Sequence, residues 1–134
     1  MLHNDLYSWM IGTPGVSSLF PGGIHHLSLP QDVETWPALT FQLITRIETA
    51  PDMNSPNDAK LDTVTYQFDV YSDASASGIT AAESFLGIFR NFRGTMTTTE
   101  IQMVELSNVS QLEERRGDKL RRRVSMDFSI TFEV

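Results

Sequence analysis

Cysteine is absent from this sequence of 134 residues, and no long apolar run is present either. Without cysteine the chain has no disulfide bridges, no thiolate ligands for zinc and no cysteine nucleophile, which fits a reducing compartment. No stretch approaches the roughly 18 apolar residues of a membrane-spanning helix. The N-terminal segment 1–15 has no lysine or arginine before its short apolar part, so it does not match a signal peptide. We expect a cytosolic protein.

Motifs that carry enzyme chemistry are also lacking. The pair Gly22-Gly23 is followed by neither a Lys-Ser/Thr pair nor a helix start, so it is not a phosphate-binding loop. No serine lies in the G-x-S-x-G sequence of many hydrolases. His25 and His26 are adjacent, and neighbours on a strand point to opposite faces, so they cannot easily share one ion with His3. We therefore expect no enzyme activity, no cofactor and no metal site.

Positive charge is scarce and concentrated in one place. The net charge of −7 argues against a general attraction to nucleic acid or anionic lipid. Six of the ten basic residues nevertheless fall within residues 115–123, which we call the basic window. This window is either a patch that grips phosphate or an acidic partner, or a solvated hairpin whose arginines pair with neighbouring acids. Because no aromatic residues are interleaved with the arginines, an acidic partner is favoured over nucleic acid.

A polar segment at residues 48–62 contains prolines and shows no periodic pattern. A loop of this length is usually functional or ordered by a partner. We expect this loop, together with a charged loop at 107–120, to reach neighbouring molecules. The candidate subunit or partner interface consists of the basic window and two aspartates of the polar loop: Arg115, Arg116, Lys119, Arg121, Arg122, Arg123, Asp52 and Asp58.

The arginines that open the last strand are expected to differ in role. Side chains alternate between the two faces of a strand, and Arg122 is in phase with the apolar Val124. We predict that Arg122 holds a carboxylate at the rim of the core, because an unpaired charge there is costly. Arg121 and Arg123 are predicted to lie on the solvated face and to matter less for folding.

Two segments with strict alternation of apolar and polar residues organise the chain. Residues 121–134 and 63–71 both show the period of two that is typical of strands with one buried face. Between them, residues 79–92 carry apolar side chains at helical spacing. Gly94 is well placed to end this helix in a left-handed conformation. We expect one sheet with this helix packed on its apolar face.

The remaining elements complete a predicted α+β fold. Helical spacing predicts a short N-terminal helix over 2–11, and β-forming residues predict strands over 38–47 and 97–106. One short extended piece is expected near 24–29. The predicted architecture is an antiparallel sheet of about four strands with a main helix on one face. We expect a single domain over residues 1–134, with an N-terminal helix and irregular segment over 1–36 and a sheet-and-helix core over 37–134.

Four short segments, taken in order, resemble a family of phage and prophage tail completion proteins, also described as tail terminator or head–tail joining proteins. They are Pro37–Gln42 (PALTFQ), Gln67–Tyr71 (QFDVY), Asn91–Thr95 (NFRGT) and Leu120–Phe128 (LRRRVSMDF). The resemblance covers about residues 36–134. The chain departs from the family pattern in residues 24–36 and in the richness of arginine in the basic window.

This resemblance implies a non-enzymatic virion protein. Its subunits would assemble into a ring, commonly a hexamer, that caps the tail tube and joins it to the head connector, with the tube and connector proteins as partners. The ring would be assembled in the host cytoplasm and reside at the head–tail interface. The alternative hypothesis is an accessory protein that contacts nucleic acid through the basic window, residues 115–123.

Overall fold

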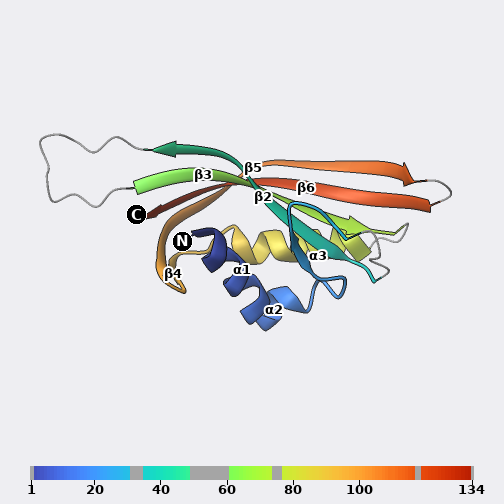
Figure 1. The fold of residues 1–134 in the computed structure, drawn as a ribbon, viewed down its shortest axis with the longest axis horizontal. Coiled ribbons are helices and arrows are strands. Elements are labelled where there is room, and N and C mark those ends of the chain that lie inside the picture. The colour runs from blue at the N-terminus through green and yellow to red at the C-terminus, as the bar shows by residue number, and fades with distance from the viewer. Residues whose placement is uncertain (1, 31–34, 49–60, 74–76, 117–118, 134) are drawn as a thin grey trace, which may run out of the picture.

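A single six-stranded sheet forms the larger part of the fold, with the strands in the order β1-β2-β3-β6-β5-β4 (Figure 1). The computed structural model describes residues 2–30, 35–48, 61–73, 77–116 and 119–133, with backbone alone for 47–48, 114–116 and 119–120. β1 runs parallel to β2, and the other neighbouring strands are antiparallel. The strands are β1 (Ile24–His26), β2 (Ala38–Glu48), β3 (Leu61–Ser72), β4 (Gly94–Met96), β5 (Thr99–Arg116) and β6 (Lys119–Glu133).

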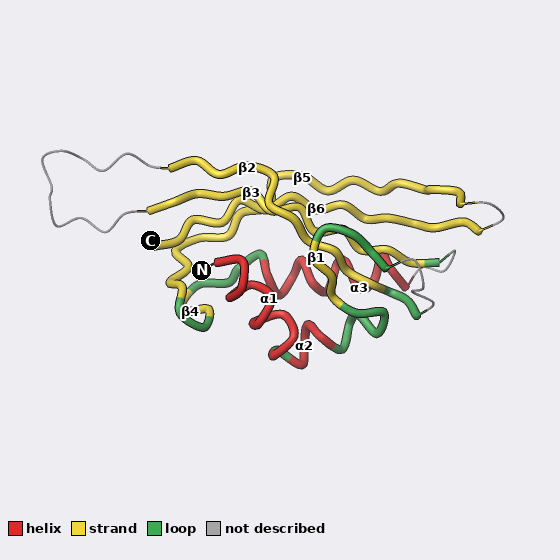
Figure 2. The backbone as a smooth tube through the Cα atoms, viewed as in Figure 1, coloured by secondary structure: helices red, strands yellow, loops and turns green. Residues whose placement is uncertain are grey.

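Three helices lie on one side of this sheet (Figure 2). They are α1 (Leu2–Gly12), α2 (Pro14–Ser17) and α3 (Ser77–Phe89). Pro14 opens α2, where a missing backbone N–H costs nothing because the first N–H groups of a helix have no partner. None of the helices in the described ranges is long and apolar enough to span a bilayer. We call the side of the sheet that faces the helices the inner face and the opposite side the outer face.

The core lies between α3 and the two central strands. Phe68 of β3 contacts the rings of Phe85 and Phe89 on α3, with centroids 5.1 and 5.2 Å apart. Phe128 of β6 is 5.7 Å from Phe68 and 4.9 Å from Phe89. All four side chains have no exposed surface. The alternation in 63–71 and 121–134 therefore identified the two strands that carry the core.

The predicted fold class is wrong. The fold is mostly β, with one curled, mixed sheet of six strands, whereas an α+β fold with about four antiparallel strands was expected. β1 and β4 have three residues each, which is too short for an alternating pattern to be visible. β1 is parallel to β2 because the chain returns to the same end of the sheet between residue 26 and the start of β2. A period in the sequence does not carry that information.

The charged loop predicted at 107–120 is also wrong where the structure describes it. Residues 99–116 form the 18-residue strand β5, which pairs with β6 from Ile101 to Arg116. The far part of this hairpin extends beyond the helices (Figure 1). Because no helix covers it there, its side chains need not alternate between apolar and polar, and the sequence pattern resembles that of a loop.

The main helix is shorter than predicted. α3 ends at Phe89 rather than at 92, and the backbone N–H of Phe92 donates to the carbonyl of Phe89 at 3.1 Å. Gly94 has the positive φ that was expected, 114°, but it begins β4 rather than ending the helix. Glycine is suited to this position because it reaches positive φ without a steric penalty.

Candidate assembly interface

Small polar side chains cover much of the outer face and are linked by hydrogen bonds across the strands. The Gln42 side-chain amide donates to Gln67 Oε1 at 3.1 Å, which joins β2 to β3. The hydroxyls of Thr63 and Thr131 are 3.1 Å apart and join β3 to β6. Between β5 and β6, the hydroxyls of Ser107 and Ser129 are 3.3 Å apart. The outer face is therefore held by neutral polar contacts from strand to strand.

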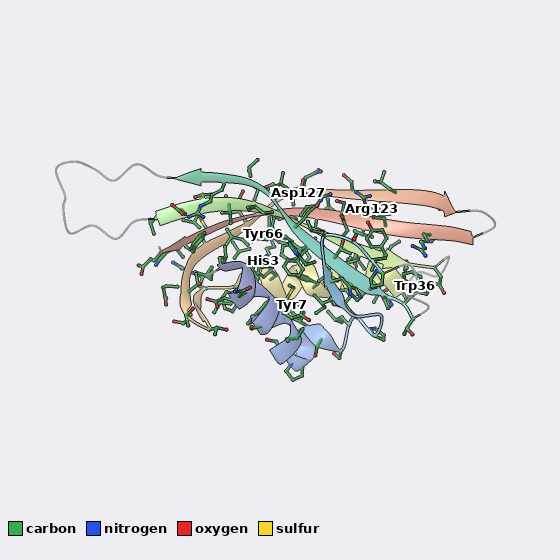
Figure 3. The ribbon with its side chains drawn as sticks, viewed as in Figure 1. His3, Tyr7, Trp36, Tyr66, Arg123 and Asp127 are labelled. Atoms are coloured by element: carbon green, nitrogen blue, oxygen red, sulfur yellow. The ribbon has the colours of Figure 1, made fainter. Side chains whose placement is uncertain are left out.

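A buried ion pair interrupts this neutral surface. Arg123 Nε lies 3.6 Å from Asp69 Oδ1, and the side chain of Asp69 is only 7% exposed. The Arg123 guanidinium also lies 6.0 Å from the ring centre of Tyr71. Arg123 and Asp127 both lie on the outer side of the sheet (Figure 3). Strand β6 sets this arrangement, since it places Arg123 opposite Tyr71 of β3.

Burial dominates the titration of Asp69. Loss of hydration raises the pKa of its carboxyl above the ordinary value. The Ser125 hydroxyl, the Arg123 charge and the Gln67 amide lower it in part, while the charge of Asp127 adds to the rise. The carboxylate therefore remains costly to ionise even with an arginine beside it.

Arg122 lies on the opposite face and is more exposed. Its Nε is 3.6 Å from Glu113 Oε1, and the two side chains are 35% and 62% exposed. Within the described residues this Nε is buried but has no hydrogen-bond partner. A hollow of about 330 Å³ lies beside the pair, bordered by Ile79 of α3 and by Leu112 of β5. The hollow leaves open space beside the Arg122 side chain.

Arg121 contacts the segment that leads into β2. Its guanidinium carbon lies 5.0 Å from the ring centre of Trp36, within the range of a cation–π interaction. This contact joins the hairpin to residues 35–37, which the sequence did not place near the basic window. Together with the contact of Arg123 with Tyr71, the window therefore makes two described aromatic contacts, although no aromatic residue lies within the window itself.

The structure places some of the candidate interface residues and leaves others undescribed. Arg121, Arg122 and Arg123 lie together on β6, each with a contact from a different part of the fold. The other basic candidates, Arg115, Arg116 and Lys119, lie on β5 and β6, but their side chains fall outside the described part. Asp52 and Asp58 lie outside the described residues altogether. The role of all these candidate residues at an interface stays a prediction.

The predicted environment of Arg123 is wrong, whereas that of Arg122 is not. Arg122 does hold a carboxylate, Glu113, as expected. Arg123, however, is 25% exposed and pairs with the buried Asp69, so it is not simply on a solvated face. The reason is that β6 lies between β3 and β5 at this point, and neighbouring side chains shield the outer face there.

Asp5 is a buried polar residue that the sequence reasoning missed. It lies on α1 and is 5% exposed. Its carboxylate accepts hydrogen bonds from the backbone N–H of Thr98 at 3.2 Å and from the hydroxyls of Thr98 and Thr99. Burial alone would raise the pKa of Asp5, but these hydrogen bonds outweigh it and lower the pKa. The one sequence feature that could have indicated its burial is that Asp5 lies between the apolar Leu2 and Leu6 on the same helix.

His25 and His26 have different surroundings, as expected for neighbours on a strand, but His26 contacts His3. His25 is bonded through Nε2 to the Gly22 carbonyl at 3.0 Å, whereas the His26 ring lies 4.2 Å from that of His3. Burial, together with the nearby His26, lowers the pKa of His3. Both rings also contact Phe41. Among the described side chains, no three histidine or acidic residues are grouped as metal ligands would be.

The chain belongs to the class of mostly β folds, with one curled six-stranded sheet and a projecting hairpin. Its fold is similar to that of a chain in the structure described as "Virion of native gene transfer agent (GTA) particle". The superposition covers 99% of this chain and 92% of that chain, with a TM-score of 0.61 and 12% sequence identity. No family model and no curated protein matches the sequence. At this identity the similarity establishes a shared fold.

Proposed function

We propose that this chain is a structural protein of a phage-like virion, and specifically a tail terminator or tail completion protein. Its copies form a homo-oligomeric ring, which we expect to be a hexamer. The ring caps the tail tube and joins it to the head connector. The observation that carries this proposal is the likeness in fold, over nearly the whole chain, to a chain of a gene transfer agent virion. The ordered motifs in residues 36–134 support the more specific role.

The hairpin of β5 and β6 supports an assembly role. It carries the basic window at its far end, while the rest of the chain has four basic against fourteen acidic residues, counting Glu113, Glu114 and Asp118 with the window. Opposite charges on different parts of one surface favour head-to-tail contact between copies. In this proposal the basic window, with Arg121–Arg123, meets an acidic surface of the next subunit, and the loop that contains Asp52 and Asp58 reaches another neighbour.

Light scattering of the purified protein, with and without the tail tube protein, tests this role. We expect a discrete oligomer several times the mass of the 15.1 kDa chain, and a larger complex when tubes are added. A protein that stays monomeric at all concentrations and never associates with tubes would contradict the proposal.

The second candidate is an accessory protein that contacts nucleic acid, because the arginines are clustered. Arg122 and Arg123 already have carboxylate neighbours, Glu113 and Asp69, which reduces their attraction for phosphate. This candidate predicts DNA binding that weakens steeply with salt and is lost when Arg121, Arg122 and Arg123 are all changed to Ala. No binding at low salt would end it.

A further inference from the structure

Within the described residues, two opposite edges of the sheet have no pairing strand over most of their length. β1 pairs with β2 only at Leu39–Phe41, and β4 pairs with β5 only at Thr99–Ile101. Beyond these short strands, no described backbone segment pairs with the outer edge of β2 from residue 42 or of β5 from residue 102. Open edges present unpaired N–H and C=O groups, which bind another strand readily.

Both open edges also expose apolar side chains. Leu43 and Ile44 on β2 are 48% and 47% exposed, and Val109 and Leu112 on β5 are 42% and 47% exposed. Among the described residues, five of the nine exposed large apolar side chains lie on these two strands, Met103 being the fifth. Such side chains beside an open edge indicate a surface that another strand covers.

The strand directions allow one copy to continue the sheet of another. From β2 through β3 and β6 to β5, each strand is antiparallel to the one before it. β5 therefore runs opposite to β2. If β5 of one copy lies beside β2 of the next, the pair is antiparallel and the alternation continues without a break. A contact between two different edges is head-to-tail, and such contacts close into rings when the rotation fits.

We infer that the open edge of β5 in one subunit pairs with the open edge of β2 in the next, so that the sheets of successive copies form one continuous sheet around the assembly. The occupant of each edge is a second copy of this chain. This inference rests on the proposed ring and names the surfaces that hold it together. Main-chain hydrogen bonds supply the affinity, and the exposed apolar side chains select the partner edge.

Single lysines on each edge test the pairing, because an edge lysine blocks strand addition. Ile44→Lys changes the β2 edge and Val109→Lys changes the β5 edge. Ile11→Lys on α1 is the matched control, since Ile11 is 50% exposed and lies on neither edge. Sizing by light scattering should show the ring for the parent protein and the control, and loss of the ring for each edge variant alone.

Mixing the two edge variants provides the decisive readout. The Ile44→Lys chain keeps an intact β5 edge and the Val109→Lys chain keeps an intact β2 edge, so the mixture should form a dimer and stop there. Misfolded chains would not restore this dimer. A ring that persists in either variant, or a mixture that stays monomeric, would overturn the edge pairing while leaving the proposed function intact. A parent protein that never assembles would overturn both.

Discussion

The two faces of the central strands are stabilised in different ways. On the inner face, Phe68 and Phe128 pack against α3 with no exposed surface. On the outer face, the same strands carry threonines, serines and glutamines joined by hydrogen bonds, with Arg123 and Asp69 as a shielded ion pair. Apolar burial contributes far more stability per side chain than neutral polar contacts do. The inner face therefore accounts for folding, and the outer face and edges are available for assembly.

The largest expected effect is on the inner face. Phe128→Ala should lower the free energy of unfolding by about 3–5 kcal/mol, the usual cost of emptying a buried aromatic site. The matched control is Ser129→Ala on the next residue, whose outward side chain loses only the exposed hydrogen bond to Ser107 and should cost at most about 1 kcal/mol. Urea unfolding of both variants measures the contrast. Equal effects would show that the two faces do not differ as described.

Asp5→Ala should be the next most harmful change. It leaves the N–H and hydroxyl of Thr98 and the hydroxyl of Thr99 without their acceptor. We expect a loss of about 3 kcal/mol, because hydrogen bonds to a buried charge are strong and unpaired donors are costly. Thermal unfolding compared with Asn4→Ala, an exposed neighbour on α1, is the measurement. A melting temperature equal to that of the control would show that the hydrogen bonds of Asp5 do not stabilise the fold.

Substitutions of Arg123 and Arg122 compare a shielded ion pair on the outer face with an exposed one on the hairpin. Arg123→Ala should cost about 1–2 kcal/mol, because it leaves the buried Asp69 without its cation. Arg122→Ala should cost less than about 1 kcal/mol, because its partner Glu113 is exposed and such pairs are weak. Denaturant unfolding of the two variants compares them. Equal and small losses would mean that the whole cluster is a solvated patch.

The smallest effect is a pH dependence on the outer face. The folded protein holds the proton on Asp69 more tightly than the unfolded chain does, since burial raises its pKa. Relative to Asp69→Asn, the wild-type protein should gain stability as the pH falls from 7 through the folded pKa of Asp69. The gain should be complete below about 3.8, the ordinary value for this group. Unfolding curves at several pH values test the sign, and a difference that shrinks on acidification would reverse it.

The inner face could be predicted from the sequence because alternation in β3 and β6 reports burial directly. The edges of the sheet and the contacts between residues far apart in the sequence could not be predicted. The part of β5 in the projecting hairpin has no strict alternation of apolar and polar residues to reveal it, and β1 has only three residues. Asp5 finds its threonines 93 and 94 positions away. Arg123 was assigned to solvent because strand phase gives the face of a residue but not what shields it.

Electron microscopy of tail tubes mixed with the purified protein tests the central claim most directly. We expect a ring of this protein seated at one end of each tube, with tubes of defined length when the protein is present during assembly. Tubes whose ends stay bare, from a protein that is folded by its melting curve, would contradict the account.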